Sequence, residues 1–189
     1  MQCKTSAPYF WKAIESPTRI RMNNPEPRQL NIISPPPVLY IDIIVKGISY
    51  SDTVTADRWK SHSANIGRSS RGSWEWQKEY PHYQNRPNRF EVGLWKGGVL
   101  CALCFGQLSK HGSRVRMNLI ESTPERPTPP GIRALPILAF AAATFADIVG
   151  ATELWVLDPD PNIESLYMKE GFGSIEIYHG RRVGQRRIL

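Results

Sequence analysis

Residues 158–172 carry the pair of side chains whose types and spacing are most suggestive of chemistry. Asn162 has an amide that both donates and accepts hydrogen bonds, and five residues later Tyr167 has a phenol that can donate a proton. Asp160 is suited to the N-cap of a helix at this point. Pro161 is suited to its first position, because the missing N–H would have no partner there.

The pattern predicts a short helix over residues 161–170. Gly171 provides a left-handed end for it, and Phe172 can fold back onto the last turn. Ile163 and Tyr167 lie four residues apart and therefore share one helix face. The alternative interpretation is a surface helix whose tyrosine belongs to the core and whose asparagine only caps the first turn.

The spacing Asn-x4-Tyr-x3-Gly-Phe directly follows an apolar stretch at 154–157. In this setting it resembles the cofactor-side helix of the GCN5-related N-acetyltransferase (GNAT) superfamily. The resemblance implies that acetyl-CoA is the cosubstrate and that Asn162 contacts the acyl-CoA arm. It further implies that Tyr167 is the acid that protonates the departing CoA sulfur.

The same resemblance directs attention to residues 128–134. Family members have a Gly-rich turn before a long helix, and its backbone N–H groups hold the CoA pyrophosphate. Gly131 and Ile132 match the family pattern, whereas Thr128 replaces an Arg or Gln and Arg133 replaces a small residue. The cofactor-binding residues implied here are Gly131, Ile132, Arg133 and Ala134. Prolines in the turn remove N–H donors, so a rigid connector in a fold that has lost its cofactor remains the alternative.

The resemblance also assigns polarisation of the thioester carbonyl to a backbone N–H near the end of a strand, at Leu119, Ile120 or Glu121. Leu119 and Ile120 are therefore expected cofactor contacts. Glu121 is the candidate general base, acting directly or through a water; its alternative is a solvated loop carboxylate. Glu91 is the second candidate, although the alternation in its own strand predicts that it faces solvent.

The acceptor site is expected between the N-terminal helices and the sheet, in a region rich in aromatic residues. These are Trp59, Trp74, Trp76, Tyr80 and Tyr83. They suit a groove for a ring-bearing or peptide amine or, as the alternative, a small core. Because GNAT folds serve many acceptors, the resemblance does not choose among them.

The chain has 24 basic and 17 acidic residues, a net charge of +7. A positive field attracts CoA phosphates, an acidic acceptor or nucleic acid. Four arginines gather in the last nine residues: Arg181, Arg182, Arg186 and Arg187. They support a second hypothesis, a non-catalytic GNAT-like module that binds protein or nucleic acid.

Three cysteines are too few for a disulfide framework. Cys101 and Cys104 have CxxC spacing, but they lie in an apolar strand, where they are expected to face opposite sides as small hydrophobic residues. No metal site is predicted. The N-terminus lacks an apolar signal core, so a cytoplasmic protein is expected. The apolar tract at 134–151 contains Pro136 and Asp147 and is interpreted as a core helix, with no membrane partner.

The elements that must position these residues follow from periodicity and turn signals. Strands are predicted at 38–45, 90–95, 99–107, 114–121, 154–157, 174–179 and 185–189, and helices at 52–65, 73–83, 131–149 and 161–170. This order predicts an α/β fold with a mixed, mostly antiparallel central sheet flanked by helices, as in GNAT proteins. We expect residues 1–37 to form a Pro-rich irregular extension and residues 38–189 a single GNAT-like acyltransferase domain.

Overall fold

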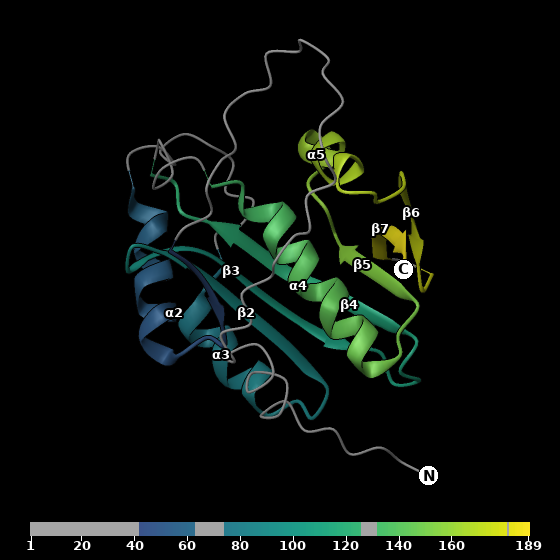
Figure 1. The fold of residues 1–189 in the computed structure, drawn as a ribbon, viewed down its shortest axis with the longest axis horizontal. Helices are drawn as coiled ribbons and strands as arrows, with labels where there is room; N and C mark the ends of the chain where they lie inside the picture. The colour runs from purple at the N-terminus through teal and green to yellow at the C-terminus, as the bar shows by residue number, and fades with distance from the viewer. Residues whose placement is uncertain (1–41, 63–73, 126–131, 181) are drawn as a thin grey trace, which may run out of the picture.

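The computed structural model describes residues 42–62, 74–125, 132–180 and 182–189. Within them, seven strands form one sheet in the order β1-β2-β3-β4-β5-β7-β6 (Figure 1). The strands are β1 Ile43–Lys46, β2 Arg89–Lys96, β3 Val99–Leu108, β4 Arg114–Ser122, β5 Glu153–Leu157, β6 Ile175–Tyr178 and β7 Arg182–Ile188. Only the β4–β5 pair is parallel. The predicted mixed, mostly antiparallel sheet is confirmed.

Helices cover both faces of this sheet. They are α2 Tyr50–Asp57, η1 Arg58–Ser61, α3 Trp76–Gln84, α4 Ala134–Val149, η4 Pro161–Ile163 and α5 Glu164–Lys169. In Figure 1, α4 crosses the face of the sheet turned toward the viewer. It packs on the alternating side chains Phe90, Val92 and Leu94 of β2. The aromatic side chains of α2, η1 and α3 pack with Trp95 and Phe105 on the opposite face.

The long helix α4 is buried because its sequence is almost wholly apolar. Leu138, Ala142 and Ala146 are fully inaccessible and lie against the sheet. Gly150 ends the helix with a φ of 73°, the left-handed conformation that costs glycine least. The helix begins at Ala134, three residues later than predicted, and residue 131 lies outside the described part of the chain.

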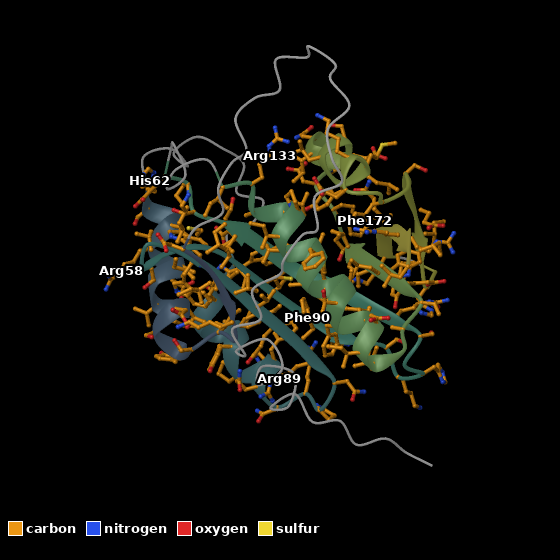
Figure 2. All side chains as sticks on the ribbon, in the orientation of Figure 1. Arg58, His62, Arg89, Phe90, Arg133 and Phe172 are labelled. Atoms are coloured by element: carbon orange, nitrogen blue, oxygen red, sulfur yellow. The ribbon has the colours of Figure 1, made fainter. Side chains whose placement is uncertain are left out.

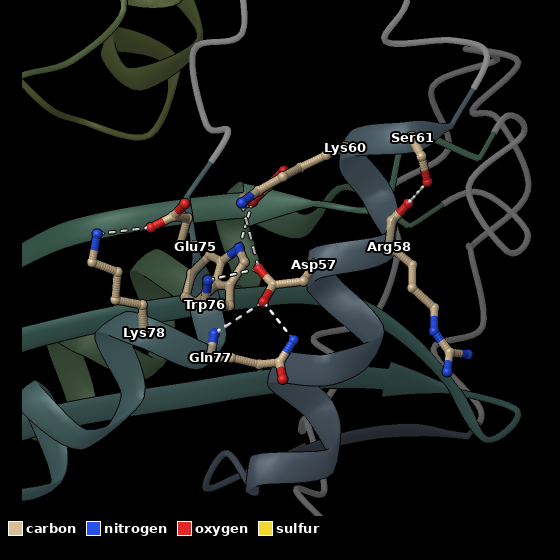
Figure 3. Close-up of polar contacts among 9 residues, drawn as sticks. Asp57, Arg58, Lys60, Ser61, Glu75, Trp76, Gln77 and Lys78 are labelled. Atoms are coloured by element: carbon tan, nitrogen blue, oxygen red, sulfur yellow. Dashed lines mark hydrogen bonds and ion pairs between the residues drawn. The ribbon is translucent and has the colours of Figure 1, made fainter.

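The start of α3 is set by a contact that is distant in sequence. Asp57, at the end of α2, accepts hydrogen bonds from the backbone N–H of Trp76 at 2.7 Å and of Gln77 at 3.2 Å (Figure 3). This carboxylate satisfies the first free N–H groups of the helix. The predicted start at Ser73 is therefore wrong. The helix predicted at 73–83 continues past Pro81, which lies inside it, and ends at Gln84, one residue later than predicted.

A bulge changes the orientation of the two cysteines. The register between β2 and β3 shifts at Leu94 and Trp95, so that Leu94 faces Ala102 and Trp95 faces Leu100. Cys101 is the extra residue, and both Cys101 and Cys104 are therefore buried on the α4 face. The expectation that they face opposite sides is wrong, whereas their burial as small hydrophobic residues is confirmed.

Other boundaries differ from the predictions by a few residues. The predicted helix at 52–65 is α2 followed by the 3-10 helix η1, which ends at Ser61. Ser49 caps α2 through a capping box with Asp52, which explains the earlier start. The extension expected at 1–37 lies outside the described residues.

Candidate active site

The parallel strands β4 and β5 separate after a short contact. Their pairing runs from Arg114 opposite Glu153 to Met117 opposite Val156 and then ends. β4 continues to Ser122 in register with β3 alone. Its last five residues therefore have an edge without a strand partner, and a pocket of about 110 Å³ opens beside them. The residues that line it include Trp74, Asn118, Ile120, Leu157, Ile163 and Tyr167.

Backbone alternation decides which peptide group of β4 faces this split. Thr123 donates its N–H to the carbonyl oxygen of Cys101 at 2.8 Å. Since hydrogen-bonded and non-hydrogen-bonded positions alternate in antiparallel strands, Glu121 also directs its peptide group toward β3. Ile120 then directs its N–H toward the split, and its side chain also lines the pocket. Leu119, the other predicted cofactor contact, is buried on the α3 face of the sheet.

Tyr167 reaches the pocket from α5. The side chain is only 6% exposed, and burial together with Cys104 raises the pKa of its phenol to about 12. The phenol therefore stays protonated at neutral pH. Its hydroxyl makes no hydrogen bond to another described residue, so the proton is available to a ligand.

Local sequence signals hold Tyr167 in place. Phe172 packs edge-on against its ring at 6.2 Å between centroids and donates its N–H to the Tyr167 carbonyl. Gly171 has a φ of 84°, as its predicted role requires. Asp160 caps the start of the segment by accepting the Asn162 N–H at 2.8 Å.

The predicted helix at 161–170 is interrupted. Ile163, at the junction of η4 and α5, has φ −117° and ψ 13°, so a 3-10 turn precedes a six-residue α-helix. Asn162 lies in that turn with an exposed side chain. Its predicted contact with the acyl-CoA arm stays a prediction.

Glu121 lies on the opposite face of the sheet from α4, next to Ile120 in sequence. Its carboxylate accepts a hydrogen bond of 2.5 Å from Nε1 of Trp76. Burial raises the pKa of this carboxyl to about 7, and the Trp76 bond and the Lys60 charge oppose the shift only in part. The group therefore changes its protonation state near neutral pH, which suits a general base.

Glu91 is buried rather than exposed. Only 8% of it is accessible, because the end of α3 covers this part of β2. Gln84 donates to the Glu91 carboxylate at 2.7 Å, and Arg89 lies 3.7 Å away. Burial raises the pKa of this carboxyl too. The expectation that strand alternation turns Glu91 to solvent is wrong, since both faces of β2 are covered.

The N-terminus of α4 opens into a second pocket, of about 370 Å³. Arg133 is the N-cap residue, and its side chain makes no capping hydrogen bond there. Figure 2 shows Arg133 at the N-terminal end of α4, on the side of α5. The wall opposite is formed by Leu166 and Lys169 of α5 and by Glu170 directly after it. Ala134 and Ile132 also line this pocket, whereas Gly131 lies outside the described residues.

Uncapped N–H groups and two cations make this second pocket suited to a phosphate group. Pro136 lies in the first turn of α4 and removes one further N–H donor. Arg133 and Lys169 place two positive charges beside these N–H groups, and Glu170 places one negative charge there.

The aromatic residues divide between core and site. Trp59, Trp76 and Tyr83 are buried in the cluster beneath α2 and α3. Trp74 instead lines the pocket at the split, and its Nε1 is buried without a hydrogen-bond partner among the described residues. The Oδ1 atom of Asn118, in the same pocket, is likewise buried without a hydrogen-bond partner among the described residues. Buried polar atoms without a protein partner are uncommon, so these two atoms are candidates to bind a ligand.

Sequence reasoning did not identify Asn118. The register between β3 and β4 shifts between Phe105 and Gly106, which leaves Asn118 as the extra residue. Its side chain is thereby directed to the α3 face, where its Nδ2 donates to the Tyr83 hydroxyl at 3.0 Å. No signal in the sequence marked it, because Asn118 continues the regular alternation of polar Arg114 and Arg116 with apolar Val115 and Met117.

Two findings bear on partners other than acyl-CoA. Within the described ranges, no three His, Cys, Asp or Glu side chains are close enough together to hold a metal ion. No helix in the same ranges is both long enough and apolar enough to cross a membrane.

Comparison with known proteins rests on structure alone. No protein-family model and no curated protein matches the chain. The PaiA N-acetyltransferase of Thermoplasma acidophilum, solved with coenzyme A, has a TM-score of 0.57 over 79% of this chain and 100% of its own, at 15% identity. AAC(6')-Ib, solved with paromomycin and acetyl-CoA, has a TM-score of 0.57 over 78% and 93%, at 11% identity.

A third solved structure carries the family name. It is a GNAT-family acetyltransferase from Listeria monocytogenes, with a TM-score of 0.51 over 78% of this chain and 95% of its own, at 10% identity. All three matches span nearly the whole length of the other protein. Together with the split between β4 and β5 and the position of α4, they show that the chain has the GNAT fold.

Proposed function

We propose that the protein is an acyl-CoA-dependent N-acyltransferase that transfers an acetyl group from acetyl-CoA to an amine. The observation that carries the proposal is the pocket at the split, which Ile120 and Tyr167 both line. Solved proteins of the same fold contain coenzyme A or acetyl-CoA, which supports the choice of donor.

The residues of the second pocket fit the phosphate end of acetyl-CoA. Arg133 and Lys169 flank the uncapped start of α4, and an anion there is stabilised by helix N–H groups and by charge. Ser122, at the end of β4, lines the same pocket. A donor that extends from this pocket along the free edge of β4 reaches the split with its thioester.

The chemistry requires three tasks of this chain. The amine nitrogen attacks the thioester carbonyl carbon, and the N–H of Ile120 stabilises the developing oxyanion. Glu121 accepts the proton that the attacking amine loses, directly or through one water. The C–S bond then breaks, and Tyr167 gives its proton to the departing thiolate. Exchange of protons with water returns Glu121 to the carboxylate and Tyr167 to the phenol, so the amide product and free CoA account for all atoms.

Binding of the donor is the first test. Acetyl-CoA is titrated into the full chain by calorimetry, alongside Arg133→Gln and the control Arg58→Gln, whose exposed side chain points away from the fold (Figures 2 and 3). We expect binding to the wild type, a loss of about 10- to 100-fold in Arg133→Gln, and no change in the control. No heat at millimolar acetyl-CoA overturns the proposal.

Turnover is the second test. Free thiol release from acetyl-CoA is followed with a panel of amines, with each amine omitted in turn as the blank. Amine-dependent release supports acyl transfer. Tight binding without release in the presence of any amine favours the non-catalytic module instead.

A further inference from the structure

A third pocket lies on the face of the sheet away from α4. It has a volume of about 570 Å³ and is formed where the end of α3, the β3–β4 turn and the start of β7 meet. Four cationic side chains line it: Arg86, Lys110, Arg116 and Arg182. No acidic residue of the described part of the chain lines it.

The charges of this basic pocket are only partly neutralised within the fold. Arg182 makes a two-atom contact with Asp158, at 3.0 and 2.5 Å. Arg86 bonds the neutral Gln107 amide and lies over the Tyr83 ring at 4.4 Å. Neither contact gives Arg86 a compensating negative charge.

The positive charges of Arg116 and Lys110 have even fewer partners within the fold. The Nε of Arg116 is buried and has no hydrogen-bond partner among the described residues. Within those same residues, no carboxylate lies within 4.0 Å of Arg116 or Lys110. A buried guanidinium nitrogen without a partner costs free energy, and an anionic ligand in the pocket removes that cost.

Asn118 connects the basic pocket to the split. It lines both pockets, and its buried Oδ1 is an acceptor without a partner. The oxygen of a carboxamide accepts hydrogen bonds from an amine N–H. An amine held by Asn118 at the split therefore has the basic pocket as its neighbour on the side away from the donor.

We propose that the acceptor is a small amine that also carries a carboxylate or phosphate group, and that Arg116, Lys110 and Arg86 bind this group. The inference rests on the proposed acetyl transfer and narrows its substrate class. Arginine provides the planar donors that match either anion. A concave pocket suits a small molecule rather than the extended backbone of a nucleic acid.

Matched amines provide the test. Acetyl transfer is measured with common L-amino acids against the corresponding amino-acid amides, and with O-phosphoethanolamine against ethanolamine. We expect kcat/KM to be at least about 10-fold higher for the anionic member of a productive pair. Preference for the carboxylate or for the phosphate distinguishes the two anions. Equal rates within every pair, or faster transfer to neutral and cationic amines, overturn the inference and leave acetyl transfer intact.

Charge-removing variants locate the effect. Arg116→Gln and Lys110→Gln are compared with Arg58→Gln, which loses the same charge away from the basic pocket. We expect KM for the anionic amine to rise about 10- to 100-fold in the first two and to stay unchanged in the control. KM for the neutral amine and the Kd for acetyl-CoA are expected to stay unchanged in all three. Lys110 is exposed, so its variant tests the site even if Arg116→Gln folds poorly.

Binding without turnover separates this inference from the proposed function. Calorimetry of the anionic and neutral amines without acetyl-CoA is expected to show anion-dependent binding that Lys110→Gln weakens. Equal binding of the two amines, or binding that Lys110→Gln and Arg58→Gln weaken equally, contradicts the assigned pocket. A protein that binds no acetyl-CoA fails the proposed function by a separate measurement.

Discussion

Glu121 and Tyr167 both have raised pKa values because of burial, yet the consequences differ. The carboxyl has its pKa moved to about 7, so it exchanges a proton near neutral pH. The phenol has its pKa moved to about 12, so it keeps its proton there. Burial alone thus prepares one group to accept a proton and the other to donate one.

Glu121→Gln is expected to change the pH profile. The wild-type kcat/KM should rise with pH through about 7 and level off above it, because only the deprotonated carboxylate accepts the proton. The variant should lose this limb and about 10²- to 10⁴-fold in rate. Glu91→Gln is the matched control, a second buried carboxyl with a raised pKa. If only Glu91→Gln loses the rise of kcat/KM with pH, Glu91 and not Glu121 is the general base.

The same carboxyl affects stability with a defined sign. Its folded-state pKa lies above its ordinary value of 4.5, so folding favours the protonated form. This contribution is fully present below about pH 4.5 and is lost as pH rises through about 7. Above pH 7, Glu121→Gln should therefore unfold with a free energy about 1–3 kcal/mol higher than the wild type. Urea unfolding at pH 5 and pH 8 measures the difference, and a smaller gain at pH 8 than at pH 5 contradicts it.

Tyr167→Phe is expected to lower kcat by about 10²-fold or more while acetyl-CoA binds normally, because only proton donation to the thiolate is lost. Tyr178→Phe is the control, since that buried hydroxyl has no hydrogen-bond partner among the described residues and lies in a separate cluster. An unchanged kcat in Tyr167→Phe removes the acid assignment without affecting the fold or the donor site.

At the scale of elements, one carboxylate links the site to the helix beside it. Asp57 holds the start of α3 and thereby places the Trp76 indole against Glu121 (Figure 3). Asp57 also raises the pKa of Glu121 slightly through its charge. The position of α3 and the acidity of the proposed base therefore depend on the same side chain.

Asp57→Ala should lower the free energy of unfolding by about 1–2 kcal/mol, because the first N–H groups of α3 lose their acceptor. It should also shift the pH limb of kcat/KM to lower pH, since one negative charge near Glu121 is removed. Glu75→Ala is the control, because Glu75 is the N-cap residue but its side chain caps no N–H. Thermal unfolding and a pH series measure both effects, and equal destabilisation in the two variants contradicts the capping role.

Elements with local signals were predictable, and those set by distant contacts were not. Asp160 and Gly171 define the ends of their segment through neighbours within a few residues, and both act as predicted. The start of α3 depends on a residue 19 positions away. The burial of Glu91 depends on which helix covers its strand, and a sequence pattern with a period of two contains no information about that cover.

In the candidate site, too, residues placed by local signals were predictable and residues placed by distant contacts were not. Ile163 and Tyr167 both line the split, in agreement with the helix face that their spacing predicted. The role of Tyr167 as the acid stays a prediction. Asn118 was missed because a one-residue bulge reverses the orientation of every side chain after it. The basic pocket was missed because its cations come from three separate segments of the chain.

At the scale of the molecule, the net charge is +7, and several of the basic side chains have identified partners or pockets. In the C-terminal strand, Arg186 pairs with Glu153 and Glu176, and Arg187 donates to the Glu170 carbonyl. These arginines are engaged in the fold and are not free for nucleic acid. Among the described residues, cations without a carboxylate partner line the second pocket and the basic pocket, at the two ends of the proposed reaction path.

A ligand in the split contacts both parts of the sheet, so its binding should be detectable on both. Acetyl-CoA is expected to slow amide hydrogen exchange at 118–122 of β4 and at 157–167 after β5, because opening of the split then requires dissociation. Exchange in β6, which does not border the split, should change little. Protection confined to the start of α4 contradicts placement of the thioester in the split.

The shared position of Asn118 also has a use in inhibitor design. Two pockets that border one residue can be spanned by one compound, an anionic amine joined covalently to a pantetheine arm. Linking makes the second binding event intramolecular, and affinities of linked ligands exceed those of the parts by about 10²- to 10⁴-fold. The linker length that gives the highest affinity of such a bisubstrate compound would report the distance between the donor sulfur and the anion proposed to bind Arg116.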